Sequence, residues 1–140
     1  MFFLDASAII YLIEGDEGLS QATRNVITRL SAGPVEPAFA VSALSLLECR
    51  VHPLRHGDEH RLEKFDHFFN DPGLTIIDMS AQVVELATIL RAERGLRTPD
   101  ALQAASCLTL NPETPFITGD KTFRKLPALN AHIIELEVDS

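Results

Sequence analysis

The sequence predicts an α/β fold in which a mainly parallel five-stranded sheet is sandwiched between helices. Short apolar runs alternate along the chain with segments of helical periodicity, a pattern typical of βαβ units whose strands are buried on both faces. The length of 140 residues and the hydrophobic content of 46% suit one ordinary globular domain. Because no linker, internal repeat or low-complexity stretch interrupts it, we expect a single domain over residues 1–140.

Five short runs rich in apolar and β-branched residues are the expected strands, in chain order. They are Phe2–Asp5, Ala38–Val41, Leu74–Ile77, Phe116–Thr118 and His132–Leu136. Turn-forming residues bound several of them, as Asp71, Pro72 and Gly73 do before the third run.

The segments between the strands have helical periodicity and residues that favour helix ends. The expected helices are Ala8–Glu14, Leu19–Leu30, one that follows Ser42 and ends near Pro53, Asp58–Phe69, Ala81–Arg94, and one from Thr98 through Leu108. Ser7, Ser42, Ser80 and Thr98 are the expected N-caps, since a hydroxyl oxygen accepts from a free N–H of the first turn. Pro99 suits the first helical position, and Gly95 is expected to end the preceding helix.

Composition narrows the possible settings and partners. No apolar stretch approaches the roughly 20 residues of a membrane helix, the first residues lack the basic segment of a signal peptide, and Cys49 and Cys107 form no CxxC motif. We therefore expect a cytoplasmic protein with two buried thiols and no membrane partner. A net charge of −8 disfavours bulk electrostatic binding to nucleic acid, but it leaves a metal-dependent nuclease open.

Four acidic residues are spaced so that an α/β sheet would bring them to one edge. Asp5 ends the first strand, Asp120 follows the fourth across Gly119, Glu48 lies in the helix after the second, and Asp100 lies in the first turn of a helix. Ligands of open α/β sheets bind beyond the carboxyl ends of the strands. Clustered carboxylates raise one another's pKa unless a cation neutralises them, and an all-oxygen cluster suits Mg²⁺ or Mn²⁺. The pattern predicts a metal-assisted reaction, and a phosphodiester is the substrate that it favours most.

Each of these acids also has a purely structural interpretation that the sequence leaves open. Asp100 would complement the dipole of its helix, and Asp120 would shape a Gly–Asp turn. Glu48, on a mostly apolar helix, would pair with Arg50 or another base. The four acids together favour a shared site over these separate roles.

The motifs resemble the PIN-domain family along the whole chain. The matching segments are Phe3–Ser7, helical Glu48, Gly95–Ala101 and Thr118–Phe123, and the stretch Ile9–Asp16 is similar to VapC-type toxins of bacterial toxin–antitoxin pairs. The resemblance implies an Mg²⁺- or Mn²⁺-dependent endoribonuclease that acts on RNA, forms a homodimer and is inhibited by a cognate antitoxin. One departure is Gly119, which stands where the family often has Asn.

Roles follow from the resemblance for individual residues. Asp5, Glu48, Asp100 and Asp120 match the acidic quartet, and Ser7 and Thr118 match the hydroxyl positions beside the first and last acids. We expect Asp5 and Asp100 to bind the principal metal, with Glu48 acting through water or on the nucleophile. Asp120 would complete a second metal site, the two hydroxyls would orient carboxylates or water, and Arg97 or Lys121 would contact the substrate phosphate.

Three other functions compete with the nuclease. A receiver-type signalling module also uses strand-end acids and Mg²⁺, with Asp78 as its phospho-acceptor, but it would have an acidic doublet where Asp5 stands alone. An Asp-dependent phosphatase would have a second acid at the position of Ser7. A catalytically inactive PIN-like scaffold would instead use the acidic pocket to bind a basic peptide.

Two further groups of residues have simpler explanations than a binding site. His52, His56 and His60 are spaced by four, but Pro53 and Gly57 are expected to interrupt the helix that zinc binding would need. Three phenylalanines at helical spacing are expected in the core or in a dimer interface rather than as a base-stacking platform: Phe65, Phe68 and Phe69. Dimerisation is expected through the apolar helices Ala8–Glu14 and Ala81–Leu90.

Overall fold

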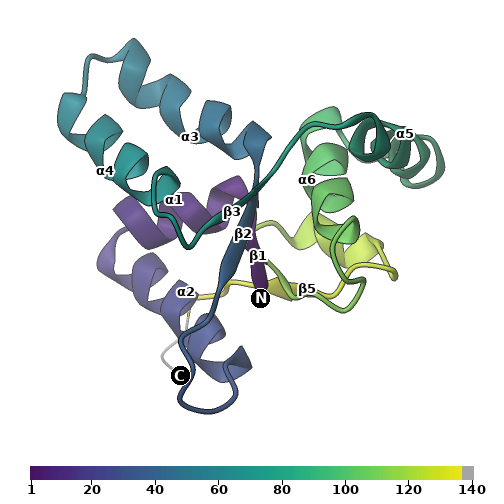
Figure 1. Cartoon of the computed structure of the whole chain (residues 1–140), viewed down its shortest axis with the longest axis horizontal. Coiled ribbons are helices and arrows are strands. Elements are labelled where there is room, and N and C mark those ends of the chain that lie inside the picture. The colour runs from purple at the N-terminus through teal and green to yellow at the C-terminus, as the bar shows by residue number, and fades with distance from the viewer. Residues whose placement is uncertain (137–140) are drawn as a thin grey trace.

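The computed structural model, which describes residues 1–136, contains a five-stranded sheet whose strands all run parallel (Figure 1). The strands are β1 (Phe2–Leu4), β2 (Phe39–Ser42), β3 (Thr75–Ile77), β4 (Phe116–Thr118) and β5 (Ala131–Ile133). Their order is β3-β2-β1-β4-β5. The α/β prediction is thus confirmed, and β1 and β4 are the neighbours between which the strand order reverses, where ligands of such folds bind.

Helices cover both faces of the sheet. On one side lie α1 (Ala6–Glu14), α2 (Glu17–Leu30), α3 (Ala43–Arg55) and α4 (Glu59–Phe69); on the other lie α5 (Ala81–Arg94), α6 (Thr98–Leu108) and the 3₁₀ helix η1 (Lys121–Lys125) (Figure 1). None of the helices within residues 1–136 is long and apolar enough to cross a membrane.

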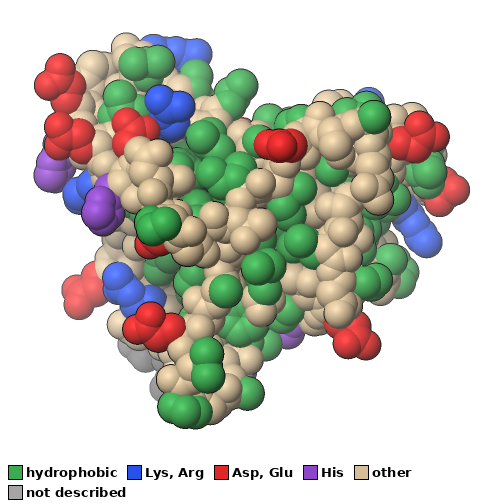
Figure 2. Space-filling model, in the orientation of Figure 1, with side chains coloured by type: hydrophobic (Ala, Val, Ile, Leu, Met, Phe, Trp, Pro, Cys, Tyr) green, Lys and Arg blue, Asp and Glu red, His purple; other side chains and the backbone are tan. Residues whose placement is uncertain are grey.

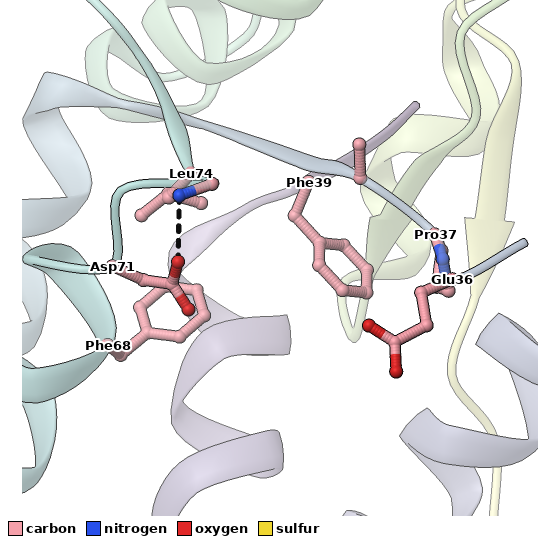
Figure 3. Close-up of a pocket in the computed structure, with 8 residues that line it drawn as sticks. Glu36, Pro37, Phe39, Phe68, Asp71 and Leu74 are labelled. Atoms are coloured by element: carbon pink, nitrogen blue, oxygen red, sulfur yellow. Dashed lines mark hydrogen bonds between the residues drawn. The ribbon is translucent and has the colours of Figure 1, made fainter.

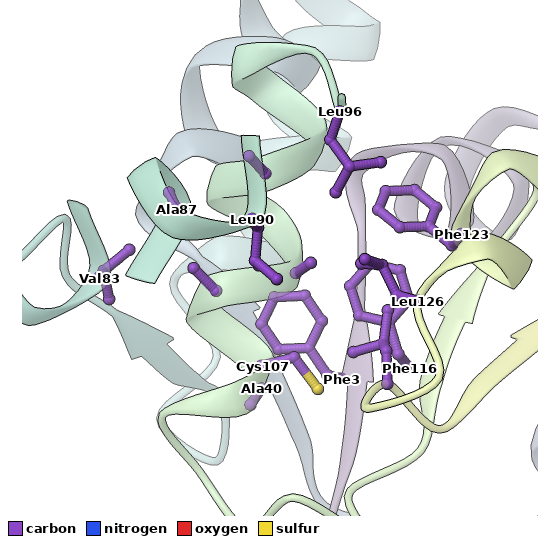
Figure 4. Close-up of a cluster of buried hydrophobic side chains, with 14 residues drawn as sticks. Phe3, Ala40, Val83, Ala87, Leu90, Leu96, Cys107, Phe116, Phe123 and Leu126 are labelled. Atoms are coloured by element: carbon purple, nitrogen blue, oxygen red, sulfur yellow. The ribbon is translucent and has the colours of Figure 1, made fainter. Parts of the chain in front are cut away.

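The core consists of two apolar clusters, one on each side of the sheet. Figure 4 shows the first, in which Phe3 and Phe116 stack at 5.3 Å between ring centroids and Phe123 of η1 packs against Phe116. The second includes Phe2, Leu4, Ile117 and Phe65. Alternate residues of β1 point into opposite clusters, so all three of its residues are buried. This burial accounts for the uninterrupted apolar run with which the sequence begins.

Several predicted helix ends are confirmed. Ser42 Oγ accepts from the backbone N–H of Leu44, and Ser80 Oγ accepts from that of Val83. Gly95 ends α5 in the left-handed conformation, with φ of 67°. These caps place the start of α3 immediately after β2 and the end of α5 shortly before α6.

Two predicted N-caps are wrong. α1 begins at Ala6 and is capped by Asp5, whose carboxylate accepts from the N–H of Ala8, so Ser7 lies inside the helix. α6 begins at Thr98, and its N-cap Arg97 makes no side-chain capping bond. In both helices the first turn therefore starts one or two residues earlier than expected, and in α1 the shift makes the capping residue an acid of the predicted site.

The chain also differs from the prediction at Pro53 and near its C-terminal end. Pro53 does not end its helix, which continues to Arg55; its ring is fully buried, and that burial offsets the hydrogen bond that proline cannot donate. The last strand is shorter than expected and begins one residue earlier, at Ala131 rather than His132. No periodic signal had indicated η1, which is only five residues long.

Candidate active site

Asp5 lies at the carboxyl end of β1 and is almost completely buried, with 5% of its surface exposed. Its Oδ1 accepts from Ser7 Oγ at 2.7 Å and from Ala8 N at 3.0 Å, and its Oδ2 accepts from the hydroxyl of Thr118 at the end of β4. A single carboxylate therefore caps α1 and joins the two strands at which the strand order reverses.

Burial raises the pKa of Asp5 from 3.8 to about 6, because the charged form loses its hydration. The hydrogen bonds from Ser7, Thr118 and the Ala8 amide oppose this rise, and the negative charge of Glu48 adds to it. Such a carboxylate gains strongly from a nearby cation. A raised pKa in a group at a ligand-binding edge is typical of functional sites.

The hydroxyls of Ser7 and Thr118 also position the loop that follows β4. Ser7 Oγ accepts from the N–H of Gly119 at 2.9 Å, and Thr118 Oγ1 accepts from the N–H of Asp120 at 3.0 Å. Both hydroxyls donate to Asp5 at the same time. Asp5 and the backbone of this loop are thus parts of one hydrogen-bonded network.

Asp120 is joined to this network through its backbone rather than through its carboxylate. Its Oδ1 accepts from the N–H of Thr122 at 2.8 Å and caps η1. The structural role anticipated for Asp120, shaping the turn after Gly119, is therefore present. Its carboxylate is half-buried and is not among the charges that shift the pKa values of Asp5 or Glu48.

Glu48 lies half-buried on α3, which follows β2. Its Oε1 accepts from the side-chain amide of Gln103 on α6 at 2.9 Å. Burial raises its pKa, the hydrogen bond from Gln103 opposes that rise, and the charge of Asp100 adds to it. Arg50, an expected partner of Glu48, pairs instead with Asp66 at 3.1 Å.

Asp100 lies in the first turn of α6, as predicted, and its Oδ2 accepts from Arg97 Nε at 3.1 Å. The side chain of Arg97 is 77% exposed, whereas that of Asp100 is 14% exposed. In this ion pair the Asp100 carboxylate is therefore largely buried, whereas the Arg97 guanidinium lies in solvent. An exposed ion pair of this kind is weak, so a stronger cation can replace the guanidinium without a large cost.

The structure thus couples three of the four predicted acids through their charges. The charge of Glu48 raises the pKa of Asp5, the charge of Asp100 raises the pKa of Glu48, and the donor atoms of all three are carboxylate oxygens. This donor chemistry fits a hard divalent cation. Within residues 1–136, however, no three His, Cys, Asp or Glu side chains lie close enough to hold a metal together. Glu48 is turned to Gln103, and Asp100 is turned to Arg97.

Tyr11 of α1 explains why glycine stands before Asp120. A Cβ built on Gly119 would lie 2.5 Å from Tyr11 Cε2 and 2.8 Å from the Tyr11 hydroxyl. The tyrosine ring occupies the space that a side chain at position 119 would need. The departure from the usual Asn is therefore matched by a bulky neighbour, and it does not leave the loop loose.

Gln103 and Tyr11 were not predicted as residues of the site, although the position of each in its helix gave a signal. Gln103 is three residues after Asp100 on one helix, and Tyr11 is four residues after Ser7 on another. Residues at these spacings share a helix face. Their partners, Glu48 and Gly119, are far away in the sequence, so the contacts themselves could not be inferred.

Within residues 1–136, the side chains of the histidine and phenylalanine groups make no hydrogen bond or ion pair to the four acids. His52, His56 and His60 are exposed, and the rings of the first two lie 4.3 Å apart between centroids. Phe65 and Phe69 are buried in the core, as expected. Phe68 is half-buried and lines a cavity of about 280 Å³ with Phe39 and Leu74 (Figure 3). This cavity lies at the amino ends of β2 and β3, opposite the acidic edge.

The sheet topology argues against the receiver-type alternative. Asp78 follows β3, an edge strand that is separated from β1 by β2. Adjacent strands are needed to bring a phospho-acceptor beside Asp5, and the neighbours of β1 are β2 and β4. Asp78 is also exposed, so nothing in the described part of the chain joins it to the acidic edge.

One protein-family model matches most of the sequence. The sequence model of the PIN domain matches residues 2–129. The chain belongs to the PIN-domain family. The match includes all four predicted acids and both hydroxyl residues of the Asp5 network. No curated protein sequence matches the chain.

Solved structures of toxin–antitoxin complexes share this PIN fold. A chain of VapBC2 from Rickettsia felis, bound to a DNA fragment from its promoter, superposes with a TM-score of 0.74 at 22% identity, covering 96% of this chain and 100% of that one. A toxin–antitoxin complex from Klebsiella pneumoniae gives 0.70 at 21%, covering 92% and 95%. VapBC-1 from nontypeable Haemophilus influenzae gives 0.67 at 16%, covering 94% and 96%. At these identities the similarity establishes the fold.

Proposed function

We propose that this PIN-domain chain is a divalent-metal-dependent endoribonuclease and the toxin of a VapBC-type pair, with one nuclease domain over residues 1–140. The observation on which this rests is the buried carboxylate of Asp5, bound by Ser7 and Thr118 and electrostatically coupled to Glu48. Its position beside the strand-order reversal, and the neighbours' membership of toxin–antitoxin complexes, both support the assignment.

Asp5 and Asp100 would hold Mg²⁺ or Mn²⁺, with Glu48 completing the site directly or through water. When bound, such a cation acidifies a water and offsets the charge that develops on the phosphate oxygens. Ser7 and Thr118 fix the rotamer of Asp5, so that this carboxylate is already positioned before the ion arrives. Asp120, which is fixed by its own cap to η1, would contribute to a second, substrate-dependent ion site.

Arg97 and Lys121 would contact the phosphate of the RNA. Both are exposed, and they flank Asp100 and Asp120 respectively. Arg97 is bound to Asp100 in this structure, and a cation on Asp100 would free its guanidinium for the substrate. Two local positive charges of this kind allow a chain with a net charge of −8 to bind RNA at one edge only.

The antitoxin would bind at the same acidic edge. A basic side chain offered by the partner would pair with carboxylates that otherwise repel one another. The Rickettsia felis and Klebsiella pneumoniae proteins were solved as toxin–antitoxin complexes, which supports a protein partner here. The acids could not bind a basic side chain of the antitoxin and a metal ion at the same time. Binding of the antitoxin would therefore inhibit the toxin.

A homodimer would form through α3 rather than through α1. No residue of α1 is exposed, whereas α3 presents an apolar stripe of Leu47, Val51 and Leu54, exposed by 63%, 44% and 68%. The spacing of four and three places them on one helix face. Apolar side chains also gather over the middle of the face that Figure 2 shows, where Figure 1 places β2 and β3. Val84 and Ile89 of α5 are exposed too.

Leu54→Asp is expected to convert the dimer to a monomer. The substitution places a charge in the stripe, where the partner would otherwise bury an apolar side chain. Light scattering at micromolar concentration should give twice 15.4 kDa for the wild type and 15.4 kDa for the variant. Val35→Asp is the matched control, because Val35 is 77% exposed and lies outside the stripe. A wild type that remains at the monomer mass would exclude this interface.

The proposed activity is tested by incubating antitoxin-free protein with total cellular RNA and Mg²⁺ or Mn²⁺, with and without EDTA. Discrete fragments that disappear with EDTA are expected. Asp100→Asn should lower cleavage at least about 100-fold, since loss of a metal ligand or its support costs on that order. Its fold should persist, because within residues 1–136 the carboxylate of Asp100 bonds to no side chain other than that of the exposed Arg97. Absence of cleavage by folded wild type would favour the inactive scaffold, in which the acids only bind a basic peptide.

A further inference from the structure

We infer that Gln103 is a positioning residue that fixes the carboxylate of Glu48 for metal binding, an inference that rests on the proposed nuclease function. Gln103 is 3% exposed and is the one long side chain among the buried residues of α6, which are otherwise small: Ala101, Ala104, Ala105, Ser106 and Cys107. Its Nε2 donates to Glu48 Oε1 at 2.9 Å and to Ser45 Oγ at 2.9 Å.

The orientation of this amide follows from its partners. An ionised carboxylate only accepts hydrogen bonds, so the nitrogen of Gln103 must face Glu48. Both amide hydrogens are then used, one on Glu48 and one on Ser45, which is itself fully buried. Rotation of the amide would bring its oxygen against the carboxylate. Gln103 is thus restricted to one orientation.

The same arrangement leaves Gln103 Oε1 without a partner. It is a buried side-chain oxygen for which residues 1–136 provide no donor. A buried acceptor in this condition destabilises the fold, and an apolar residue of equal length would fill the same space at no such cost. Packing therefore does not explain glutamine at this position, whereas the two hydrogen bonds made by its nitrogen do.

Gln103 also connects the two helix layers at the acidic edge. Glu48 and Ser45 belong to α3 on one side of the sheet, and Gln103 belongs to α6 on the other. Asp100 is one turn before Gln103 on the same helix. The amide consequently sets the position of Glu48 relative to the helix that bears Asp100. Without it, the half-buried side chain of Glu48 would turn to solvent, and the ion would lose a directed ligand.

Gln103→Met is the informative variant, because methionine has a similar length and neither donates nor accepts strongly. We expect the Kd for Mn²⁺, measured by titration calorimetry without RNA, to rise about 10-fold or more. The Tm of the metal-free protein should change by less than about 5 °C, because removal of the unpaired oxygen offsets the loss of Ser45's partner. The matched control is Gln21→Met, which removes an exposed amide bound to Asn25 on α2 and should leave both quantities unchanged.

A double variant separates positioning from a structural role. In a Glu48→Gln background, Gln103→Met should cause no further loss of Mn²⁺ affinity, because the group it positions is already neutral. An equal loss of affinity in both backgrounds would overturn the inference, as would an unchanged Kd in the single variant.

If Gln103→Met fails to fold, the inference can still be tested on protein that retains Gln103. The side-chain amide resonances of Gln103 should shift on addition of Mg²⁺ and in Glu48→Gln. Resonances that do not respond to either change would overturn the inference. Wild-type protein that neither binds Mn²⁺ nor cleaves RNA would refute the proposed function itself; wild type that does both, with Gln103→Met unchanged, would refute only the role of Gln103.

Discussion

Asp5→Asn is expected to abolish metal-dependent RNA cleavage while making the metal-free protein more stable at pH 7. The ionised carboxylate is buried, and its pKa of about 6 records the cost of that charge. The rise from 3.8 corresponds to roughly 3 kcal/mol at pH 7. An amide carries no charge, so the variant should recover part of this free energy, about 1–3 kcal/mol, as a higher Tm.

The pH dependence of stability has a defined sign. Between pH 3.8 and about 6 the folded protein binds more protons at Asp5 than the unfolded chain does. The contribution of Asp5 to the free energy of unfolding is therefore greatest below the pKa of the unfolded chain, and it falls as pH rises through the pKa of the folded protein. Thermal unfolding in EDTA from pH 4 to 7 should show this decline in wild type and a flatter profile in Asp5→Asn.

Asp16→Asn is the matched control for this prediction. Asp16 also caps a helix, by accepting from the N–H of Leu19 at 2.8 Å, but it is exposed. Asparagine is an equally good cap, so neither the Tm nor cleavage should change. If Asp5→Asn lowers the Tm at pH 7 in EDTA, the hydrogen bonds to the carboxylate outweigh the cost of burying its charge, and the prediction is wrong.

Gly119→Ala is expected to destabilise the protein by about 1–3 kcal/mol, the usual effect of overpacking, and to lower cleavage. The added methyl group would lie 2.5 Å from a ring carbon of Tyr11. Gly119 is not among the glycines with positive φ, so the effect is steric. Either the ring or the loop that carries Asp120 must move. Chemical denaturation and the RNA assay measure the two consequences.

Removal of the ring should reverse this effect. Gly119→Ala combined with Tyr11→Ala should be less destabilised than the sum of the two single variants, because the double variant has no clash. Gly18→Ala is the control, since the nearest atom to its added Cβ is a side-chain carbon of Leu136 at 3.3 Å. Strict additivity of the Tyr11 and Gly119 variants would show that the ring does not occupy this space in solution.

Local signals in the sequence were sufficient for most of the fold. Apolar runs marked the strands most clearly at β1, β2 and β4, which are buried on both faces. Ser42, Ser80 and Gly95 marked helix ends through bonds within a few residues. At two of the positions where the prediction failed, a distant contact outweighed the local preference. Pro53 stays helical because its ring is buried, and the cap of α1 is Asp5 rather than Ser7.

The site was predictable as a set of acids but not as a network. The positions of Asp5 and Asp120 followed from the strand ends, because parallel strands bring their carboxyl ends together. The contacts that fix Asp5 and Glu48 join residues 113 and 55 positions apart. A pattern within a single segment cannot predict contacts between residues so far apart. These contacts follow from the three-dimensional structure, in which β1 lies beside β4 and α3 lies near α6.

The pairing of β1 with β4 has a consequence for synthesis of the protein on the ribosome. Asp5 is synthesised 113 residues before Thr118, whose hydroxyl fixes its second oxygen from the neighbouring strand β4. Translation proceeds from the N-terminus, and non-local strand pairs form late. Under the proposed function, a growing polypeptide in which β4 has not yet been made would therefore leave the RNA around it intact, and a prematurely terminated product without β4 would have no assembled centre.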